Sequence, residues 1–365
     1  MDALEVARRR LHNQHLSGVA LSDPVAVVRH LGCVQAQEYA VARWAVGQRC
    51  AGVDDDAVRD AVDAGRILRT HIIRPTWHFV APEDIRWIQA ATAPRVHRLS
   101  GTYYRMHGLD DEMAARTAKV IASALRGGNH LTRPELAAVL AAAGLPATGN
   151  HLAYVVMRAE LDCLIVNGPM RGKQHTYALL DERVPDRGPD YTPDEALAEL
   201  TRRFFTSHGP ATVKDFASWS SLTLTQIRHG LSLVGPALES VTVDGRVYWF
   251  APSAPPPRDP SPTAHVLPIY DEYVQAYSEG RLPIVNVADR DIGPANLNML
   301  AHPLVLDSQL IGYWRRTVTG AGIEVTPTVA VDLSDAERAA IEAAFARYGA
   351  FAGATVTVAW PARAT

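Results

Sequence analysis

The sequence predicts an α+β protein with three tandem winged-helix units followed by a C-terminal β-barrel-like domain. One observation is that several helical segments followed by a strand pair recur three times before residue 253. A second is that short β-branched runs dominate after a proline-rich stretch. The chain has 365 residues, of which 47% are hydrophobic and 21% charged, so it is globular and long enough for more than one core.

The first unit is expected over residues 1–82. Its helical patterns cover residues 3–16, 24–31, 39–50 and 55–64, and its strand-like runs cover 67–73 and 76–80. The two runs turn near Arg74 and Pro75, as a β-hairpin would. The unit therefore ends in a wing.

The second unit is expected over residues 83–190, with its first clear helix at 112–126. Thr132 is a candidate N-cap, because Pro134 follows in the first turn of the next helix. A helix at 151–162 precedes strands at 163–166 and 176–179. The Gly/Pro loop between these strands is the expected second wing.

The third unit is expected over residues 191–252. Thr192 and Thr212 are candidate N-caps of two helices, and a third helix covers residues 224–233. Runs at 238–243 and 247–250 form a hairpin that turns at Asp244-Gly245. Three helices and a hairpin are the winged-helix variant of the helix-turn-helix.

Residues 253–262 contain five prolines and are expected to form a linker. Residues 263–365 are expected to form the β-barrel-like domain. Its strand-like runs are 266–269, 282–287, 305–306, 310–318, 323–328, 329–333 and 354–360, with one helix at 335–348.

Composition excludes several classes of protein. No apolar run approaches the ~18 residues of a membrane span, and the N-terminal stretch lacks the apolar core of a secretory signal. Cys33, Cys50 and Cys163 match neither a disulfide framework nor a metal-binding spacing. We expect a cytoplasmic protein without metal or cofactor. The net charge of −3 argues against a general DNA coat protein, although a local basic patch can still bind phosphates.

Gln35-Ala36-Gln37 is the most informative short segment. In an α-helix, residues i and i+2 point about 200° apart, so the two amides could not serve one site. In an extended segment they lie on the same side. We therefore expect Gln35 and Gln37 on an extended or irregular link, with Glu38 pointing elsewhere. Taken alone, the pair has a simpler interpretation as surface glutamines between helices.

Four segments, taken in order, resemble AlkZ-type bacterial DNA glycosylases of the AlkZ/YcaQ winged-helix superfamily. They are Gln35-Ala36-Gln37, THIIRPTWHFV at 70–80, LPIYDEY at 267–273 and IGYWRR at 311–316. The resemblance implies winged helices and a β-barrel around a DNA channel, and hydrolysis of the N-glycosidic bond of alkylated purines. It assigns the catalytic role to Gln35 and Gln37. YcaQ-like relatives have an aspartate at the second position, where this chain has Gln37.

Two neutral amides suit a substrate that already carries a positive charge. A purine alkylated at N7 or N3 is a good leaving group, so the enzyme must mainly aim a water and stabilise the sugar cation. An amide carbonyl can accept a hydrogen bond from that water while the NH2 group contacts phosphate or base. We therefore expect a monofunctional glycosylase for cationic alkylpurines, especially bulky N7-alkylguanine adducts or cross-links formed by a genotoxic natural product, acting in self-resistance.

Basic and histidine side chains supply candidate contacts to double-stranded DNA. The wing of the first unit offers His71, Arg74 and His78, and Arg74 suits phosphate by its planar fork. The remaining candidates are Arg95, Arg98, Arg105, Arg171, Lys173, Arg315 and Arg316. Buried histidines and solvated arginines are the simpler interpretations of several of these positions. Tyr270-Asp271-Glu272-Tyr273 is assigned to salt bridges with arginines rather than to catalysis.

Two rival functions stay open at this level. A winged-helix regulator would bind a DNA sequence without catalysis, but the helix at 150–162 is apolar or acidic and lacks the polar face of a major-groove reader. A protein that sequesters a small molecule would bind its ligand without DNA.

Overall fold

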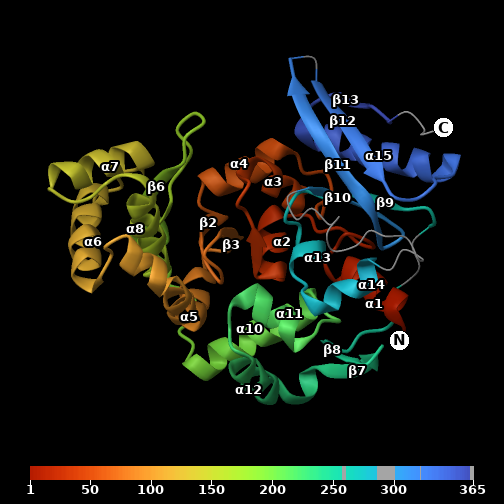
Figure 1. Ribbon diagram of the computed structural model, residues 1–365, viewed down its shortest axis with the longest axis horizontal. Coiled ribbons are helices and arrows are strands. Elements are labelled where there is room, and N and C mark those ends of the chain that lie inside the picture. The colour runs from red at the N-terminus through yellow and green to blue at the C-terminus, as the bar shows by residue number, and fades with distance from the viewer. Residues whose placement is uncertain (257–259, 286–300, 321, 362–365) are drawn as a thin grey trace.

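The structure is a computed structural model that describes residues 1–256, 260–285, 301–320 and 322–361. Figure 1 shows one lobe that holds α5 to α8 with the sheet of β6, and a larger body that holds the N-terminal, α10–α12 and C-terminal elements. The candidate N-caps Thr132, Thr192 and Thr212 each accept a hydrogen bond from the third helical residue and form a capping box. The helix starts expected at these three positions are therefore confirmed.

The N-terminal region contains a three-stranded sheet of order β1-β3-β2 and four helices. Its elements are α1 (Ala3–Asn13), α2 (Pro24–Leu31), β1 (Cys33–Gln35), α3 (Tyr39–Gly47), α4 (Asp55–Asp63), β2 (Leu68–His71) and β3 (Trp77–Val80). Strand β1 was not expected from the sequence. It follows Gly32, whose φ of +79° ends α2 and lets the chain turn back toward β3.

The second region repeats the order helix, strand, helix, helix, hairpin behind a long helix. Its elements are α5 (Ile85–Met106), α6 (Asp111–Leu125), β4 (Leu131–Thr132), α7 (Arg133–Ala142), α8 (Gly149–Leu161), β5 (Ile165–Asn167), β6 (Thr176–Leu179) and α9 (Leu180–Arg183). The sheet order β4-β6-β5 matches that of the first region. Helix α5 links this lobe to the rest of the molecule (Figure 1).

The third region has the same order again. Its elements are α10 (Pro193–Ser207), α11 (Val213–Ser220), α12 (Leu224–Val234), η1 (Gly235–Ala237), β7 (Glu239–Val243) and β8 (Arg246–Phe250). A single bridge between Ala211 and Trp249 takes the place of a first strand. Asp244 and Gly245 both have positive φ, as the expected two-residue turn requires.

The C-terminal region is an open, curled sheet of order β13-β12-β11-β10-β9 with α15 packed beside it. Its elements are β9 (Ala264–Val266), α13 (Glu272–Gln275), η2 (Glu279–Arg281), α14 (Leu282–Val285), β10 (His302–Leu306), β11 (Gln309–Thr319), β12 (Gly322–Val329), α15 (Asp335–Ala352) and β13 (Val356–Val358).

Two details of this region correct the sequence expectation. The strand expected at 282–287 is helical over Leu282–Val285, and its last two residues lie outside the described residues. A short apolar run does not by itself distinguish strand from helix. The separate runs at 323–328 and 329–333 are not two strands, because one strand, β12, ends at Val329 and residues 330–333 are not in a strand.

The sheet region does not have a core of its own. One hydrophobic cluster joins helices α2 to α4 to the sheet and α15, with Trp44, Trp314 and Phe345 at its centre. Trp44 also donates its indole N–H to the carbonyl of Val266 at 2.7 Å. The C-terminal region is therefore packed directly behind the segment that carries the two glutamines.

Candidate functional site

The two glutamines lie on the link between β1 and α3. Gln35 is the last residue of β1 and stands opposite His78 of β3, and the Ala36 N–H donates to the carbonyl of Trp77 at 2.8 Å. Gln37 lies at a bend before α3 begins at Tyr39. The expectation of an extended or irregular link, rather than a helix, is confirmed.

Both side-chain carbonyls turn to the β2–β3 hairpin. Gln35 Oε1 accepts from Arg74 Nη2 at 3.2 Å, and Gln37 Oε1 accepts weakly from the Trp77 N–H at 3.4 Å. Gln35 is only 7% exposed, whereas Gln37 is half-buried and Glu38 is exposed. In the described part of the chain, neither glutamine NH2 group donates a hydrogen bond to the protein. Gln37 is thus the more accessible amide, and Gln35 the more firmly held one.

Side chains of opposite charge hold the main chain of Gln35-Ala36-Gln37. The buried carboxylate of Glu272 accepts from the Gln35 N–H at 2.8 Å. The Arg69 guanidinium donates to the Ala36 carbonyl at 2.9 Å and to the Gln37 carbonyl at 3.3 Å. Three successive residues are therefore tied by charge-assisted hydrogen bonds, which are stronger than neutral ones. This fixes the directions in which the two amides leave the backbone.

Arg74 and His78 form a connected pair beside Gln35. His78 Nδ1 lies 2.8 Å from the Thr76 carbonyl, so this nitrogen carries the proton. Nε2 of the same ring then accepts from Arg74 Nη2 at 3.0 Å. Burial, and then the charge of Arg74, lower the pKa of His78 to about 3, so the ring is neutral at physiological pH. Arg74 keeps its charge although burial lowers its pKa.

Cations and aromatic rings surround Gln37. Arg69 lies over the Trp77 ring at 4.7 Å, and Arg43 lies over the Tyr39 ring at 4.5 Å. His175, from the loop of the second region, packs edge-on against Tyr39 at 4.8 Å. Burial, and then the charges of Arg69 and Arg43, lower the pKa of His175 to about 4. Arg43 is neutralised by Asp55 at 2.7 Å, whereas Arg69 has no ion pair among the described residues, so its charge is available to a phosphate.

Two polar atoms next to the glutamines lack partners. Arg74 Nε and Thr76 Oγ1 are buried and make no hydrogen bond within the described residues. Such atoms are uncommon in protein interiors and each calls for an explanation. A substrate or ordered water at this place would satisfy them.

Two expected DNA contacts prove to be inside the protein. His71 is 6% exposed, packs against the Trp77 ring with centroids 4.3 Å apart, and forms a hydrogen bond with the Glu160 carboxylate. His78 is fully buried. The expected place of both rings on a channel wall is therefore wrong: His71 lies against Trp77 and Glu160 of α8, and His78 lies on the opposite face of the hairpin, across from Gln35. Of the three residues expected on this wing, Arg74 alone touches a glutamine side chain.

The other basic candidates are spread over three regions. Arg95, Arg98 and Arg105 lie along α5, and Arg98 and Arg105 are exposed. Arg171 is exposed but paired with Glu135 at 2.7 Å, and Lys173 is exposed at the tip of the β5–β6 loop. Arg315 is exposed on β11, whereas Arg316 bonds the Tyr348 hydroxyl. The structure therefore does not gather all of them at the glutamines.

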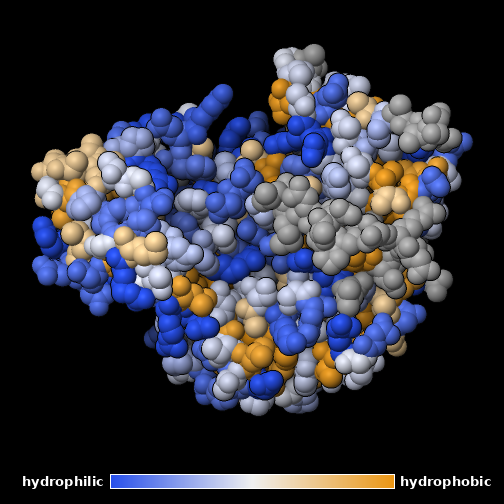
Figure 2. Space-filling view, in the orientation of Figure 1, coloured by the Kyte–Doolittle hydropathy of each residue, from blue (hydrophilic) through white to orange (hydrophobic). Residues whose placement is uncertain are grey.

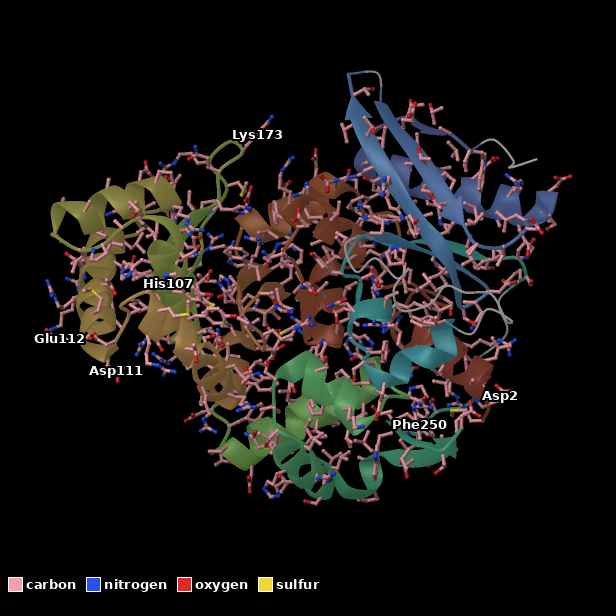
Figure 3. The ribbon with its side chains drawn as sticks, viewed as in Figure 1. Asp2, His107, Asp111, Glu112, Lys173 and Phe250 are labelled. Atoms are coloured by element: carbon pink, nitrogen blue, oxygen red, sulfur yellow. The ribbon has the colours of Figure 1, made fainter. Side chains whose placement is uncertain are left out.

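Two of these regions face each other across a hollow. Figure 2 shows the surface notched between the β5–β6 loop and the β11–β12 hairpin, with hydrophilic residues on both sides. Lys173 points outward from the loop on one rim (Figure 3). Between the rims lie the helices α3 and α4 of the region that carries the glutamines (Figure 1).

Sequence reasoning missed Arg69, Tyr39 and Glu272 at this site. The Asp271-Glu272 pair was assigned to salt bridges, and this is correct for Asp271, which pairs with the buried Arg49 at 2.9 Å. Glu272 instead holds Gln35, 237 positions earlier in the chain. Arg69 lies directly before the THIIRPTWHFV segment and could have been found there as a basic residue on a strand.

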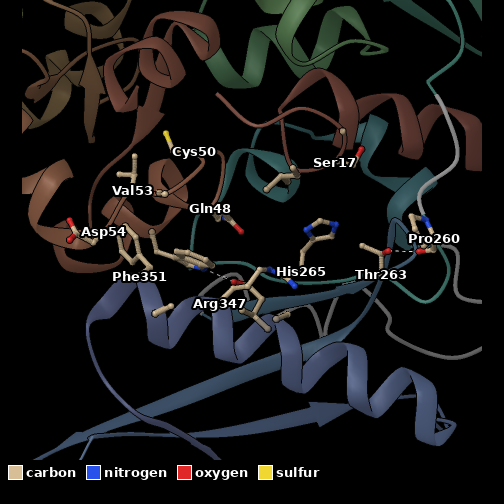
Figure 4. A pocket seen from close by; sticks show the side chains of 18 residues that line it. Ser17, Gln48, Cys50, Val53, Asp54, Pro260, Thr263, His265, Arg347 and Phe351 are labelled. Carbon is tan, nitrogen blue, oxygen red and sulfur yellow. Dashed lines mark hydrogen bonds between the residues drawn. The ribbon is translucent and has the colours of Figure 1, made fainter. Parts of the chain in front are cut away.

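A separate cavity of about 600 Å³ lies between α3, α15 and β9 (Figure 4). His265 and Arg347 line it beside Gln48, and none of its lining residues belongs to the glutamine segment. The described residues contain no group of three or more side chains suited to a metal ion. Among them there is also no helix long and apolar enough to cross a membrane.

The chain is similar to known DNA glycosylases in sequence and in fold. A curated relative, an interstrand DNA cross-link repair glycosylase of Streptomyces sahachiroi, is 28% identical over 250 residues, or 65% of this chain and 66% of the relative. The solved structure of Streptomyces sahachiroi DNA glycosylase AlkZ has the same fold, with a TM-score of 0.81 at 21% identity over 99% of this chain and 100% of that one. The model of the family described as DNA glycosylase AlkZ-like matches residues 28–351, and the chain therefore belongs to the AlkZ-like family of DNA glycosylases.

Proposed function

We propose that this chain is a monofunctional DNA glycosylase that hydrolyses the N-glycosidic bond of cationic alkylpurines, especially bulky N7-alkylguanine adducts or cross-links. The observation that carries the proposal is the pair of amides, Gln35 and Gln37, fixed on an extended link beside Arg69 and Arg74. Neither amide titrates, so the site suits a leaving group that is already charged. The relative named as a cross-link repair glycosylase supports the choice of bulky substrates.

Each glutamine has a distinct part in this reaction. The accessible Gln37 accepts a hydrogen bond from the attacking water through the free lone pair of its carbonyl, and its NH2 group contacts the lesion or phosphate. Gln35 keeps one lone pair for the same water, while Arg74 fixes the direction of its carbonyl. Positioning of this kind can lower a barrier by several kcal/mol without a shifted pKa.

The surrounding fold suits double-stranded DNA. We propose that residues 1–82, 83–190 and 191–252 are three winged-helix units, that 253–262 is the linker and that 263–365 is the β-rich domain. The hydrophilic notch between the β5–β6 loop and the β11–β12 hairpin is then the DNA channel (Figure 2). Because the notch is open, a bulky adduct can approach with little extrusion of the base, unlike the tight pockets of most glycosylases.

The origin of the lesion belongs to the same proposal. A natural product that alkylates DNA endangers the cell that makes it, and an enzyme that removes the adduct protects that cell. We propose this self-resistance role for the chain, acting as a monomer in the cytoplasm and on the nucleoid. A neighbouring gene cluster for an alkylating product would support it, and an enzyme active only on simple methylated purines would contradict it.

The rival function, a sequence-reading regulator, is less well supported by the helices. In α8, most of the residues that a recognition helix would expose are buried, among them Leu152, Val155 and Glu160. Helix α4 carries four aspartates, which repel phosphate. Helix α12 has an exposed polar face with Gln226 and Arg228, so it is the place where a regulator would read bases.

The test is release of free modified bases from duplex DNA treated with a panel of alkylating agents. The proposal predicts release of N7- and N3-alkylpurines, with bulky adducts and cross-links included, and no release of neutral lesions. Tight binding to one DNA sequence without any base release would contradict it and support the regulator.

A further inference from the structure

We propose that Glu272 is a positioning residue for base release, which holds the main chain of Gln35 so that the two amides share one reaction centre. The inference rests on the glycosylase function proposed above. Glu272 comes from α13 in the C-terminal region, so it also makes the site depend on a segment far from the glutamines in sequence.

Glu272 links the main chain of Gln35 to Trp219 of α11 and to His208 at the end of α10. It is fully buried, and Oε1 accepts from the Gln35 N–H at 2.8 Å while Oε2 accepts from Trp219 Nε1 at 3.0 Å. His208 Nε2 lies 3.4 Å from Oε2. Among the described residues, no arginine or lysine forms an ion pair with this carboxylate. His208 is thus its ion-pair partner among these residues, and without an arginine or lysine the buried carboxylate depends on the N–H groups of Gln35 and Trp219 that it accepts from.

Its neighbour Asp271 provides the contrast. Asp271 is equally buried, but both of its oxygens bond the buried Arg49 guanidinium at 2.9 Å. Arg49 lies just after the end of α3, and Gln35 lies four residues before the start of α3 at Tyr39. The two adjacent acids therefore form hydrogen bonds with the two ends of the segment that contains α3. Asp271 does so as an ordinary ion pair, and Glu272 does so by accepting the N–H of Gln35.

The charge state of Glu272 fixes the direction of its hydrogen bond with Gln35. Burial favours the protonated acid, but His208, 3.4 Å away, followed by the charge of Arg74, lowers the pKa of Glu272 to about 2. An ionised carboxylate can only accept hydrogen bonds, so the Gln35 N–H must point at it. Arg69 pulls on the Ala36 and Gln37 carbonyls from the other side of the chain.

Exchange of Glu272 for glutamine tests this role directly. The variant Glu272→Gln has the same shape, but its NH2 group must face either the Gln35 N–H or the Trp219 N–H, and both are donors. The matched control is Asp84→Asn. Asp84 is another fully buried carboxylate that accepts an indole N–H, from Trp87 at 2.9 Å; unlike Glu272 it also pairs with an arginine, Arg203, and it does not touch the glutamines.

The experiment measures the single-turnover rate of base release, the Kd for lesion-containing duplex and the melting temperature of each protein. The inference predicts that E272Q releases base at least about tenfold more slowly than wild type, with a Kd within about twofold, whereas D84N keeps the wild-type rate. A structural role alone would reduce rate and binding together, in proportion to the folded fraction.

Each other outcome decides the question. An E272Q protein that releases base at the wild-type rate, or a rate loss shared by D84N, overturns the inference. If E272Q does not fold, Glu272→Asp decides, because it keeps the charge but is one methylene short of Gln35: slower release at unchanged Kd supports the role, and the wild-type rate overturns it. A wild-type protein that releases no base defeats the proposed function instead, which keeps the two failures distinct.

Discussion

Arg74 holds the side chain of Gln35: its Nη2 nitrogen donates to Gln35 Oε1 at 3.2 Å and to His78 Nε2 at 3.0 Å. The sequence placed Arg74 on a DNA-contacting wing, and the structure adds that it orients a glutamine. A cation on the amide carbonyl also makes the amide NH2 group a better donor, since hydrogen bonds in a chain polarise one another.

Replacement of Arg74 by lysine keeps the charge and removes the planar guanidinium, which holds Nη2 in a fixed direction between Gln35 Oε1 and His78 Nε2. We expect base release to fall by about tenfold or more, because Gln35 loses its fixed direction. Single-turnover kinetics with alkylated duplex measure the effect. The matched control is Arg228→Lys on the exposed face of α12, which should leave the rate unchanged. Equal rates of base release for wild type and R74K would show that Arg74 does not orient Gln35 for the reaction.

The rate of base release should be nearly independent of pH between about 6 and 8.5. The glutamines do not titrate, and the pKa values of His78, about 3, and Glu272, about 2, lie well outside this range. Single-turnover rates across this range should therefore vary by less than about twofold. A bell-shaped profile, or a limb with an apparent pKa between 6 and 8, would indicate a general acid or base and contradict the account.

Stability should fall as the pH is lowered from about 6.5. Burial lowers the pKa of His78 and His265 to about 3 in the folded protein, whereas an unfolded histidine titrates near 6.5. Between these values the unfolded chain binds more protons, so acid favours unfolding, and above about 6.5 these groups contribute no pH dependence. Thermal melts should show a loss of about 5 °C or more between pH 7 and pH 4.5.

His265→Gln tests the cause of this acid sensitivity, because His265 lies in the cavity wall away from the glutamines (Figure 4). The variant should show a shallower dependence of melting temperature on pH than wild type. The control His229→Gln, at a half-exposed position, should melt with the wild-type slope. Identical slopes for H265Q and wild type would contradict the assignment.

Lys173 at the tip of the β5–β6 loop should contact DNA phosphate. Lys173→Ala is expected to weaken binding severalfold for every duplex sequence and to reduce the salt dependence of binding by about one counterion. Fluorescence anisotropy at several salt concentrations measures both effects. Arg228→Ala is the control, because α12 lies on the far side of the molecule from the notch (Figure 1). A larger loss of affinity in R228A than in K173A would indicate that DNA binds at α12 instead of in the notch.

Local sequence signals gave the helices and the link, but not the contacts that complete the site. Thr132, Thr192 and Thr212 were found because N-caps depend on residues three positions apart. The extended link of Gln35 and Gln37 followed from side-chain geometry alone. Strand β1 was missed because three residues are too few for a period-2 pattern. Glu272 was missed as a site residue because its partner is 237 positions away.

Burial was the other property that the sequence did not reveal. His71 and His78 were expected to face a channel because they alternate along the hairpin. The sheet pairs β3 on both sides, with β1 and with β2, so His78 is enclosed. Alternation marks opposite faces of a strand, but it does not say which face a neighbouring unit covers. Here the Glu160 carboxylate of α8 forms a hydrogen bond with the His71 ring and covers that face of the hairpin.

Base release by a variant that carries both Gln35→Ala and Gln37→Ala tests the central claim most directly. Single-turnover assays on N7-alkylguanine duplex, with binding and melting temperature measured in parallel, should show a loss of roughly 10³-fold or more in rate, a folded protein and a Kd close to that of wild type. Release at the wild-type rate by the folded double variant would contradict the account.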